Sequence, residues 1–288
     1  MDIKNTSIVF FGTSEFSVGV LTALSENGIT PSLIVTQPDR PKGRGMEIVF
    51  SAVKDWALKN DIAIMQPESL KGGEEVELLS NSEWDLFIVA SYGLIIPQLA
   101  LDIPTRGALN VHPSLLPKYR GASPVRTQIL ADDRAVGVSI MQMDEKMDHG
   151  PIVAQGTVEL EEWPQKARIL EGLLAHEGGA LLAEVIPEWM NGSITPEAQN
   201  HDEATFCRKF TKEDGLLDLS ADGYQNYLKF CANDGWPGSY FFIEKNGAPL
   251  RVKITDAQFA DGELRVLTVV PEVKKEMRYE DFARGLSV

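Results

Sequence analysis

The chain has 288 residues, 43% of them hydrophobic and 24% charged, which favours a soluble globular protein large enough for one or two domains. No apolar run approaches the roughly 18 residues of a membrane span, and the start of the sequence lacks the basic and apolar regions of an export signal, so we expect a cytoplasmic protein with no membrane partner. The net charge of −15 argues against a general DNA binder, because affinity for phosphates comes mainly from Lys and Arg.

The first 190 residues alternate strand-like and helix-like patterns. The predicted strands are Thr6–Phe11, Pro31–Thr36, Leu86–Ser91, Ala108–His112 and Val136–Gln142. The predicted helices are Phe16 to Gly28, Ala52–Asn60, about Ser123–Ala131 and Gln165–Met190. Such alternation predicts an α/β fold with a doubly wound, mostly parallel, Rossmann-like sheet, whose ligand lies at the carboxyl ends of the strands.

The pattern changes after residue 190. Residues 191–203 are polar and contain turn formers, which is typical of a linker. An amphipathic helix is predicted at Asp222–Ala232, followed by strands at Ser239–Glu244, Leu250–Ala257 and Leu264–Val270. We therefore expect an α/β domain over residues 1–190, a linker over 191–203 and a smaller, mainly β, OB-like barrel over 204–288. Residues 204–288 are close to charge balance, so a local basic surface can exist there.

Three polar side chains form a candidate reacting group. Asn110 and His112 stand two residues apart in a predicted strand, so they face the same side. An Asn amide can donate to a developing oxyanion, and a His can accept a proton from an attacking amine. Asp148, on the loop after the next strand, can orient the imidazole. This set suits acyl transfer to an amine, although Asn-Val-His-Pro could also be a simple turn and Asp148 a turn aspartate.

Other polar residues predict no further chemistry. His149, His176 and His201 have no partner pattern and are expected at the surface or in packing. Cys207 and Cys231 fit no paired zinc spacing, so we expect two reduced thiols and no metal site. The dinucleotide fingerprint Gly-x-Gly-x-x-Gly is absent after the first strand, which disfavours a nicotinamide enzyme.

The motif around His112 carries a resemblance. Asn110-x-His112, followed by Ser114-Leu115-Leu116-Pro117 and later by Asp148, resembles the signature of formyltransferases that use 10-formyltetrahydrofolate. Further stretches resemble the methionyl-tRNA formyltransferases among them, and the similarity covers nearly the whole chain. These stretches are the loop Phe11–Phe16, the inserted loop Thr36–Gly45, the strand end Met141–Asp144, Trp236-Pro237-Gly238 and Val273–Met277.

The resemblance implies a reaction and a role for each motif. A monomer would transfer a formyl group from 10-formyltetrahydrofolate to the α-amino group of initiator methionyl-tRNA, for translation initiation. Catalysis would fall to Asn110, His112 and Asp148. The folate would be bound by Ser114, Leu115, Leu116, Pro117, Tyr92, Gly93, Leu94, Ile95, Ile96 and Asp144. The tRNA substrate would be bound by Gly12, Thr13, Arg40, Lys42, Arg44, Lys274 and Lys275. As a separate hypothesis, we expect Lys209, Lys212 and Arg278 of the carboxy-terminal segment to contact the tRNA as well.

The carboxy-terminal segment departs from the family pattern. It is shorter than usual after Gly235, and Val273 stands where a glycine is usual, so we expect a trimmed barrel. Two alternatives to a tRNA enzyme remain. An N-formyltransferase acting on a nucleotide-sugar or another small amine would need neither Arg44 nor the second domain. A non-catalytic folate-binding or RNA-binding module would not need the complete set of Asn110, His112 and Asp148.

Overall fold

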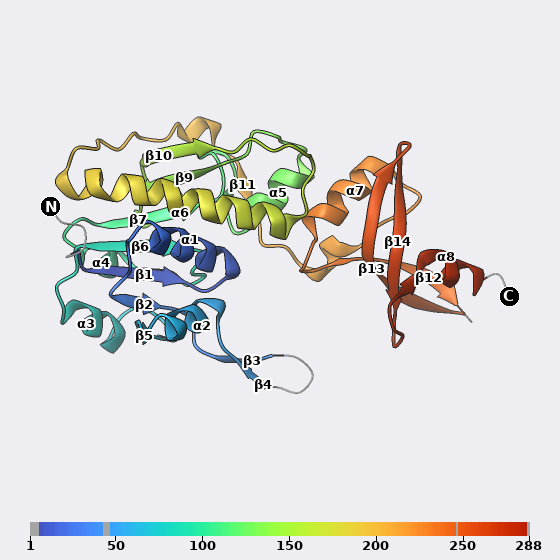
Figure 1. Ribbon diagram of the computed structural model, residues 1–288, viewed down its shortest axis with the longest axis horizontal. Helices are drawn as coiled ribbons and strands as arrows, with labels where there is room; N and C mark the ends of the chain where they lie inside the picture. The colour runs from blue at the N-terminus through green and yellow to red at the C-terminus, as the bar shows by residue number, and fades with distance from the viewer. Residues whose placement is uncertain (1–5, 43–46, 246, 287–288) are drawn as a thin grey trace. The chain divides into compact units, whose positions relative to one another are not determined.

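The computed structural model describes residues 6–42, 47–245 and 247–286, which cluster into two compact units (Figure 1). The first unit contains the described chain up to Gly121 together with Ala135–Glu159 and Glu171–Phe206. The second contains Ala122–Arg134, Leu160–Leu170 and the described chain from Cys207 onward. Within the described ranges, we find no helix that combines the length and the apolar character needed to cross a bilayer.

A central sheet organises the first unit. In the described part of the chain it has seven strands in the order β10-β9-β7-β6-β1-β2-β5. The five strands β5, β2, β1, β6 and β7 run parallel to one another, whereas β9 is antiparallel to β7 and β10 is antiparallel to β9. The predicted mostly parallel sheet is therefore confirmed. The strands are β1 (Ile8–Gly12), β2 (Leu33–Val35), β5 (Ala63–Met65), β6 (Leu86–Ala90), β7 (Ala108–His112), β9 (Gly137–Gln142) and β10 (Ile152–Thr157).

Helices and short elements complete this unit. The helices are α1 (Glu15–Glu26), α2 (Ala52–Lys59), α3 (Glu74–Ser80), α4 (Gln98–Leu101), the part of α6 (Ala167–Asn191) that follows Leu170, and the 3-10 turn η2 (His201–Glu203). Two short antiparallel pairs are β3 (Arg40–Lys42) with β4 (Glu47–Val49), and β8 (Arg120–Gly121) with β11 (Phe206–Cys207). The sequence patterns predicted α1, α2 and α6 but not α3, α4, β5 or β10, which are short or lie at an edge of the sheet.

Small residues let α6 lie very close to its neighbours. A Cβ atom added at Gly178 would stand 2.6 Å from Cγ1 of Val111 on β7, and one added at Gly179 would stand 2.7 Å from the carbonyl oxygen of Val20 on α1. Since side chains alternate along a strand, Val111 faces α6 while its neighbours Asn110 and His112 face the opposite side of the sheet. The packing of α6 thereby fixes the face on which the polar side chains of β7 stand.

The loops after β1, β2 and β6 meet at one backbone carbonyl. The oxygen of Tyr92 accepts hydrogen bonds from the Thr13 hydroxyl at 2.9 Å and from the Gln37 amide at 2.9 Å. Here the strand order turns, because β2 and β5 lie on one side of β1 while β6 and β7 lie on the other. Sheets of this kind bind ligands in the crevice at such a switch point.

The second unit is built on an antiparallel sheet in the order β12-β13-β14-β15 within the described residues. Its buried side chains include Phe241, Val252, Ile254 and Val269, and α7 packs against β13 and β14. The smaller antiparallel sheet agrees with the predicted fold class. The elements are α5 (Pro124–Leu130), η3 (Lys212–Gly215), α7 (Gly223–Ala232), β12 (Ser239–Lys245), β13 (Ala248–Ala260), β14 (Glu263–Pro271), β15 (Met277–Arg278) and α8 (Tyr279–Arg284).

Two glycines of α6 should respond oppositely to alanine. Gly179→Ala places a methyl group against the Val20 backbone and should lower the free energy of unfolding by about 1–3 kcal/mol. Gly172→Ala meets no atom within 4 Å and should raise the free energy of unfolding by about 0.5–1 kcal/mol, because Ala is the better helix former. Urea unfolding of both variants measures the contrast, and equal effects would contradict the close packing of α6.

Candidate active site

Strand β7 carries the candidate polar group. All five of its residues are buried, and the exposed fractions of Asn110 and His112 are only 9% and 5%. Among the described residues, no hydrogen bond engages the Asn110 amide. A buried amide normally has partners, so this side chain has donor and acceptor capacity to offer to a bound molecule.

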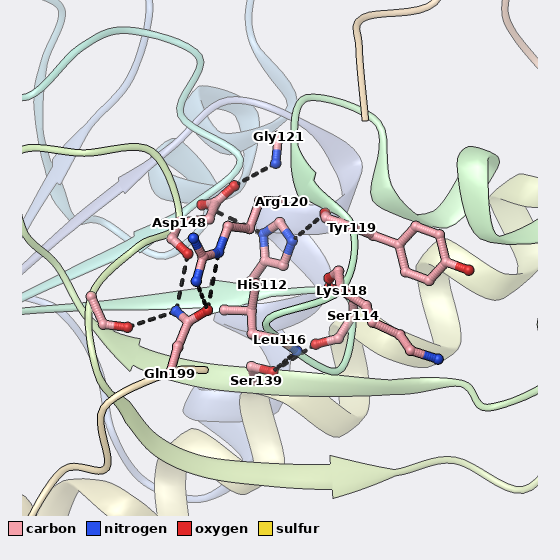
Figure 2. Close-up of polar contacts among 11 residues, drawn as sticks. His112, Ser114, Leu116, Lys118, Tyr119, Arg120, Gly121, Ser139, Asp148 and Gln199 are labelled. Atoms are coloured by element: carbon pink, nitrogen blue, oxygen red, sulfur yellow. Dashed lines mark hydrogen bonds and ion pairs between the residues drawn. The ribbon is translucent and has the colours of Figure 1, made fainter. Parts of the chain in front are cut away.

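The imidazole of His112 has a defined tautomer. Its Nε2 lies 3.0 Å from the carbonyl oxygen of Tyr119, and a carbonyl can only accept, so Nε2 carries the hydrogen (Figure 2). The other nitrogen, Nδ1, lies 3.7 Å from Oδ1 of Asp148. This separation exceeds a hydrogen bond, so the two groups lie close together without a direct bond between them. The structure thus brings the predicted His112 and Asp148 together.

Asp148 reaches His112 from the opposite end of the sheet. It belongs to the loop after β9, and because β9 runs antiparallel to β7, this loop leaves the sheet where β7 begins. Oδ2 of Asp148 accepts a hydrogen bond of 2.7 Å from the backbone N–H of Gly121, which follows the end of β7 (Figure 2). The two loops therefore cover the same face of β7, and the carboxylate is fixed by a backbone donor on one side.

The loop Ser114–Pro117 is held by the buried hydroxyl of Ser139. This hydroxyl donates to the carbonyl of Ser114 at 2.6 Å and accepts from the N–H of Leu116 at 3.0 Å and from the Gln155 amide at 2.7 Å. The Ser114 hydroxyl itself donates to the carbonyl of Lys118. A cavity of about 470 Å³ lies against this loop. Its lining residues are Leu115, Leu116, Pro117, Lys118, Tyr119, Ala135 and Glu203.

The other predicted folate residues divide into buried and exposed positions. Tyr92 and Ile96 belong to the hydrophobic core, and burial raises the pKa of the Tyr92 hydroxyl. Ile95 is 65% exposed, and Gly93 is exposed with a positive φ of 80°. Leu94 packs on the core. Asp144 accepts hydrogen bonds from the N–H of Lys146 at 2.9 Å and from His149 at 2.7 Å.

The predicted tRNA residues are spread over both units. Gly12 and Thr13 lie at the switch point described above, and Arg40, on the hairpin β3–β4, forms an exposed ion pair of 2.8 Å with Glu68. Arg44 lies outside the described residues, as does the side chain of Lys42. Lys274 and Lys275 are exposed in the second unit, as are Lys209, Lys212 and Arg278.

Sequence reasoning missed a polar network beside Asp148. Gln199 is buried, at 5% exposed, and bridges the Asp148 loop to the buried Arg120. His149 and His201, expected as surface or packing residues, stack with ring centroids 4.1 Å apart. The only sequence signal was the position of Arg120 beside the Ser114–Pro117 motif; Gln199 lies in a polar stretch that resembles a linker.

Comparisons with known proteins agree with this arrangement. The formyl transferase family matches residues 5–186. The methionyl-tRNA formyltransferase of Bacillus licheniformis is 37% identical over 97% of this chain and 95% of its own length, and that of Bacillus subtilis is 36% identical over 98% and 96%. A solved methionyl-tRNA formyltransferase from Clostridium thermocellum has a TM-score of 0.61 at 15% identity, covering 94% of this chain and 100% of its own.

The mostly parallel sheet with a polar group on β7 is that of a formyl-transferring enzyme. The chain belongs to the formyl transferase family and, within it, to the methionyl-tRNA formyltransferases. A sugar N-formyltransferase from Shewanella sp FDAARGOS_354 shares the fold, with a TM-score of 0.64 over 89% of this chain and 99% of its own, but only 16% of the residues.

The hydroxyl of Ser139 should be important for stability. Ser139→Ala leaves the carbonyl of Ser114 and the N–H of Leu116 without their buried partner, so the free energy of unfolding should fall by about 1–3 kcal/mol. Ser193→Ala, which removes an exposed hydroxyl, is the matched control and should change stability by less than about 0.5 kcal/mol. Denaturant unfolding that gave the same midpoint for both variants would refute this role.

Proposed function

We propose that this protein transfers the formyl group of 10-formyltetrahydrofolate to the α-amino group of initiator methionyl-tRNA. The observation that carries the proposal is the sequence identity of 36–37% to methionyl-tRNA formyltransferases over nearly the whole chain. The geometry supports it, because His112 and Asp148 lie together on the face of β7 that carries Asn110. A substrate of translation would place the protein in the cytoplasm.

The chemistry sets three requirements for the site. The amine nitrogen forms a bond to the formyl carbon, the bond from that carbon to N10 of the folate breaks, the amine loses a proton and N10 gains one. A free α-amino group has a pKa of roughly 8, so a large fraction is protonated near neutral pH. The site must therefore remove protons from the amine, stabilise a tetrahedral oxyanion and return a proton to the leaving nitrogen.

We assign the oxyanion to Asn110 and the proton transfer to His112. The Asn110 amide is buried and has no partner among the described residues, so its N–H groups can donate to the oxyanion. Because Nε2 of His112 is engaged by the Tyr119 carbonyl, Nδ1 is the nitrogen that can exchange a proton. An imidazolium so formed would face the Asp148 carboxylate at 3.7 Å, which stabilises the charge.

We assign tRNA binding to positively charged residues in an otherwise acidic chain. Arg40, Lys42 and Arg44 in the inserted loop would contact the acceptor end of the tRNA, together with Gly12 and Thr13. Lys274 and Lys275 in the second unit would bind backbone phosphates. The exposure of Arg40, Lys274 and Lys275 supports this assignment.

Removal of either polar side chain on β7 should slow transfer without preventing substrate binding. We expect Asn110→Ala to lower kcat by about 10²–10³-fold and His112→Ala to lower it by about 10²–10⁴-fold. The measurement is transfer of labelled formyl to charged initiator tRNA, with tetrahydrofolate binding measured in parallel. Wild-type protein that binds folate but transfers formyl only to a small amine would replace the proposed acceptor, and full activity of both variants would overturn the assigned roles.

Charge reversal in the second unit should weaken tRNA binding in a salt-dependent way. With Lys274→Glu and Lys275→Glu together, the slope of log affinity against log salt concentration should fall by about one for each lost phosphate contact. Lys229→Glu, an exposed change on α7, is the control and should leave the slope unchanged. Unaltered tRNA affinity of the double variant at low salt would exclude these two lysines from the interface.

A further inference from the structure

The side chain of Gln199 forms hydrogen bonds to the backbone of the loop that carries Asp148. Its Nε2 donates one hydrogen bond of 3.0 Å to the carbonyl of Asp148 and another of 2.7 Å to the carbonyl of Gly150 (Figure 2). An amide nitrogen has two hydrogens, so both are used on the backbone of this loop. Gln199 therefore holds the residues on either side of His149 at once.

Arg120 fixes the direction in which the Gln199 amide points. The oxygen of Gln199 accepts from Nε of Arg120 at 3.1 Å and from Nη2 at 2.5 Å. A flipped amide would set its nitrogen against a guanidinium and its oxygen against two carbonyls, all of them repulsive pairs. Because Arg120 is only 3% exposed, these bonds form away from water, where they are stronger.

Strand β8 holds Asp148 from both sides. The Arg120 side chain acts through Gln199 on the backbone of Asp148, and the N–H of the next residue, Gly121, binds its carboxylate at 2.7 Å. The segment that carries Gln199 is anchored at both ends. Glu197 exchanges two backbone hydrogen bonds with Ile152, and Arg120 donates its own N–H to the carbonyl of Thr205.

The loop that carries Asp148 has an unfavourable backbone conformation. Asp148 has a φ of +49°, in the left-handed region that non-glycine residues rarely adopt. A Cβ atom at Gly150 would stand 1.9 Å from the carbonyl oxygen of Gln142, so only glycine fits there. Such a conformation persists only when its surroundings enforce it, and the Gln199 amide supplies two of the bonds that do so.

His201 and His149 add further contacts around Arg120 and the Asp148 loop. Nδ1 of His201 accepts from Nη2 of Arg120 at 3.0 Å, so the ring is neutral at that nitrogen. Desolvation lowers the pKa of His201, and the neighbouring His149 and Arg120 lower it further. His149 stacks on His201 and bonds to Asp144, at the beginning of the same loop.

From these contacts we propose that Gln199 is a positioning residue that acts through Asp148, holding the carboxylate in the orientation that faces Nδ1 of His112. The proposal rests on the proposed function, in which Asp148 stabilises a charged His112. Gln199 itself uses its amide on two backbone carbonyls and on Arg120, so we expect it to serve the reaction without touching substrate.

The sharpest variant is Gln199→Glu. Its carboxylate can still accept from Arg120, but an oxygen replaces the nitrogen that donates to Asp148 and Gly150. Since a displacement of about 1 Å can cost 10²-fold in rate, we expect kcat for formyl transfer to fall at least about tenfold. KM for both substrates should stay within about twofold. Gln165→Glu, whose amide also donates to a backbone carbonyl, is the matched control and should leave kcat unchanged.

A double-mutant cycle tests whether the effect passes through Asp148. In an Asp148→Asn background, Gln199→Glu should lower kcat by less than about twofold more, because residues that act as a unit are not additive. If the two losses multiply, or if Gln199→Glu changes only KM or leaves kcat intact, the proposal is overturned. Should Gln199→Glu fail to fold, the near-isosteric Gln199→Met is measured in the same cycle.

Hydrogen exchange of the free protein separates this proposal from the proposed function. Gln199→Glu should raise the amide exchange rate of residues 145–150 about tenfold or more, while the core strand β6 should exchange as in the wild type. This measurement needs no substrate. It therefore tests whether Gln199 holds the Asp148 loop even if the wild type does not formylate methionyl-tRNA. Unchanged exchange in this loop would overturn the role of Gln199.

Discussion

The close approach of helix α6 to strand β7 decides on which side of the sheet the polar side chains of β7 stand. Gly178 admits the Val111 side chain to the helix face, and the alternation of the strand then turns Asn110 and His112 to the other side. On that side Ala108, at the start of β7, packs in the hydrophobic core with residues of α3 and α4. Loops instead cover Asn110 and His112 towards the end of the strand, and there the polar groups can face a substrate.

The two covering loops hold each other in place. One follows β7 and the other follows β9, and they meet where Gly121 binds the Asp148 carboxylate. The polar side chains of Ser114, Ser139 and Gln199 form hydrogen bonds to the backbone of these loops. Asn110 differs, because its amide has no partner in the described part of the chain. The site is thus organised before substrate arrives, as electrostatic stabilisation of a transition state requires.

The fold and the central pair His112 and Asp148 could be predicted from sequence because their signals are local. A buried strand reads as an apolar run, and the predicted limits of β7, Ala108–His112, coincide with those in the structure. Gln199 could not be found in this way. Its stretch has the turn formers of a linker, and its burial depends on the bridge between Glu197 and Ile152, which no local pattern encodes. Arg44 falls outside the described residues, so its place stays a prediction.

The bond between Nε2 of His112 and the Tyr119 carbonyl limits what the ring can do. A histidine with both nitrogens accessible can take up a proton on one side and release it on the other, as a relay to solvent. In this chain one nitrogen is occupied by a backbone carbonyl, so a proton that arrives at Nδ1 must also leave from Nδ1. For an amine that arrives unprotonated, the proton taken from it would then be the one available to the departing folate nitrogen, with no exchange between this ring and bulk water.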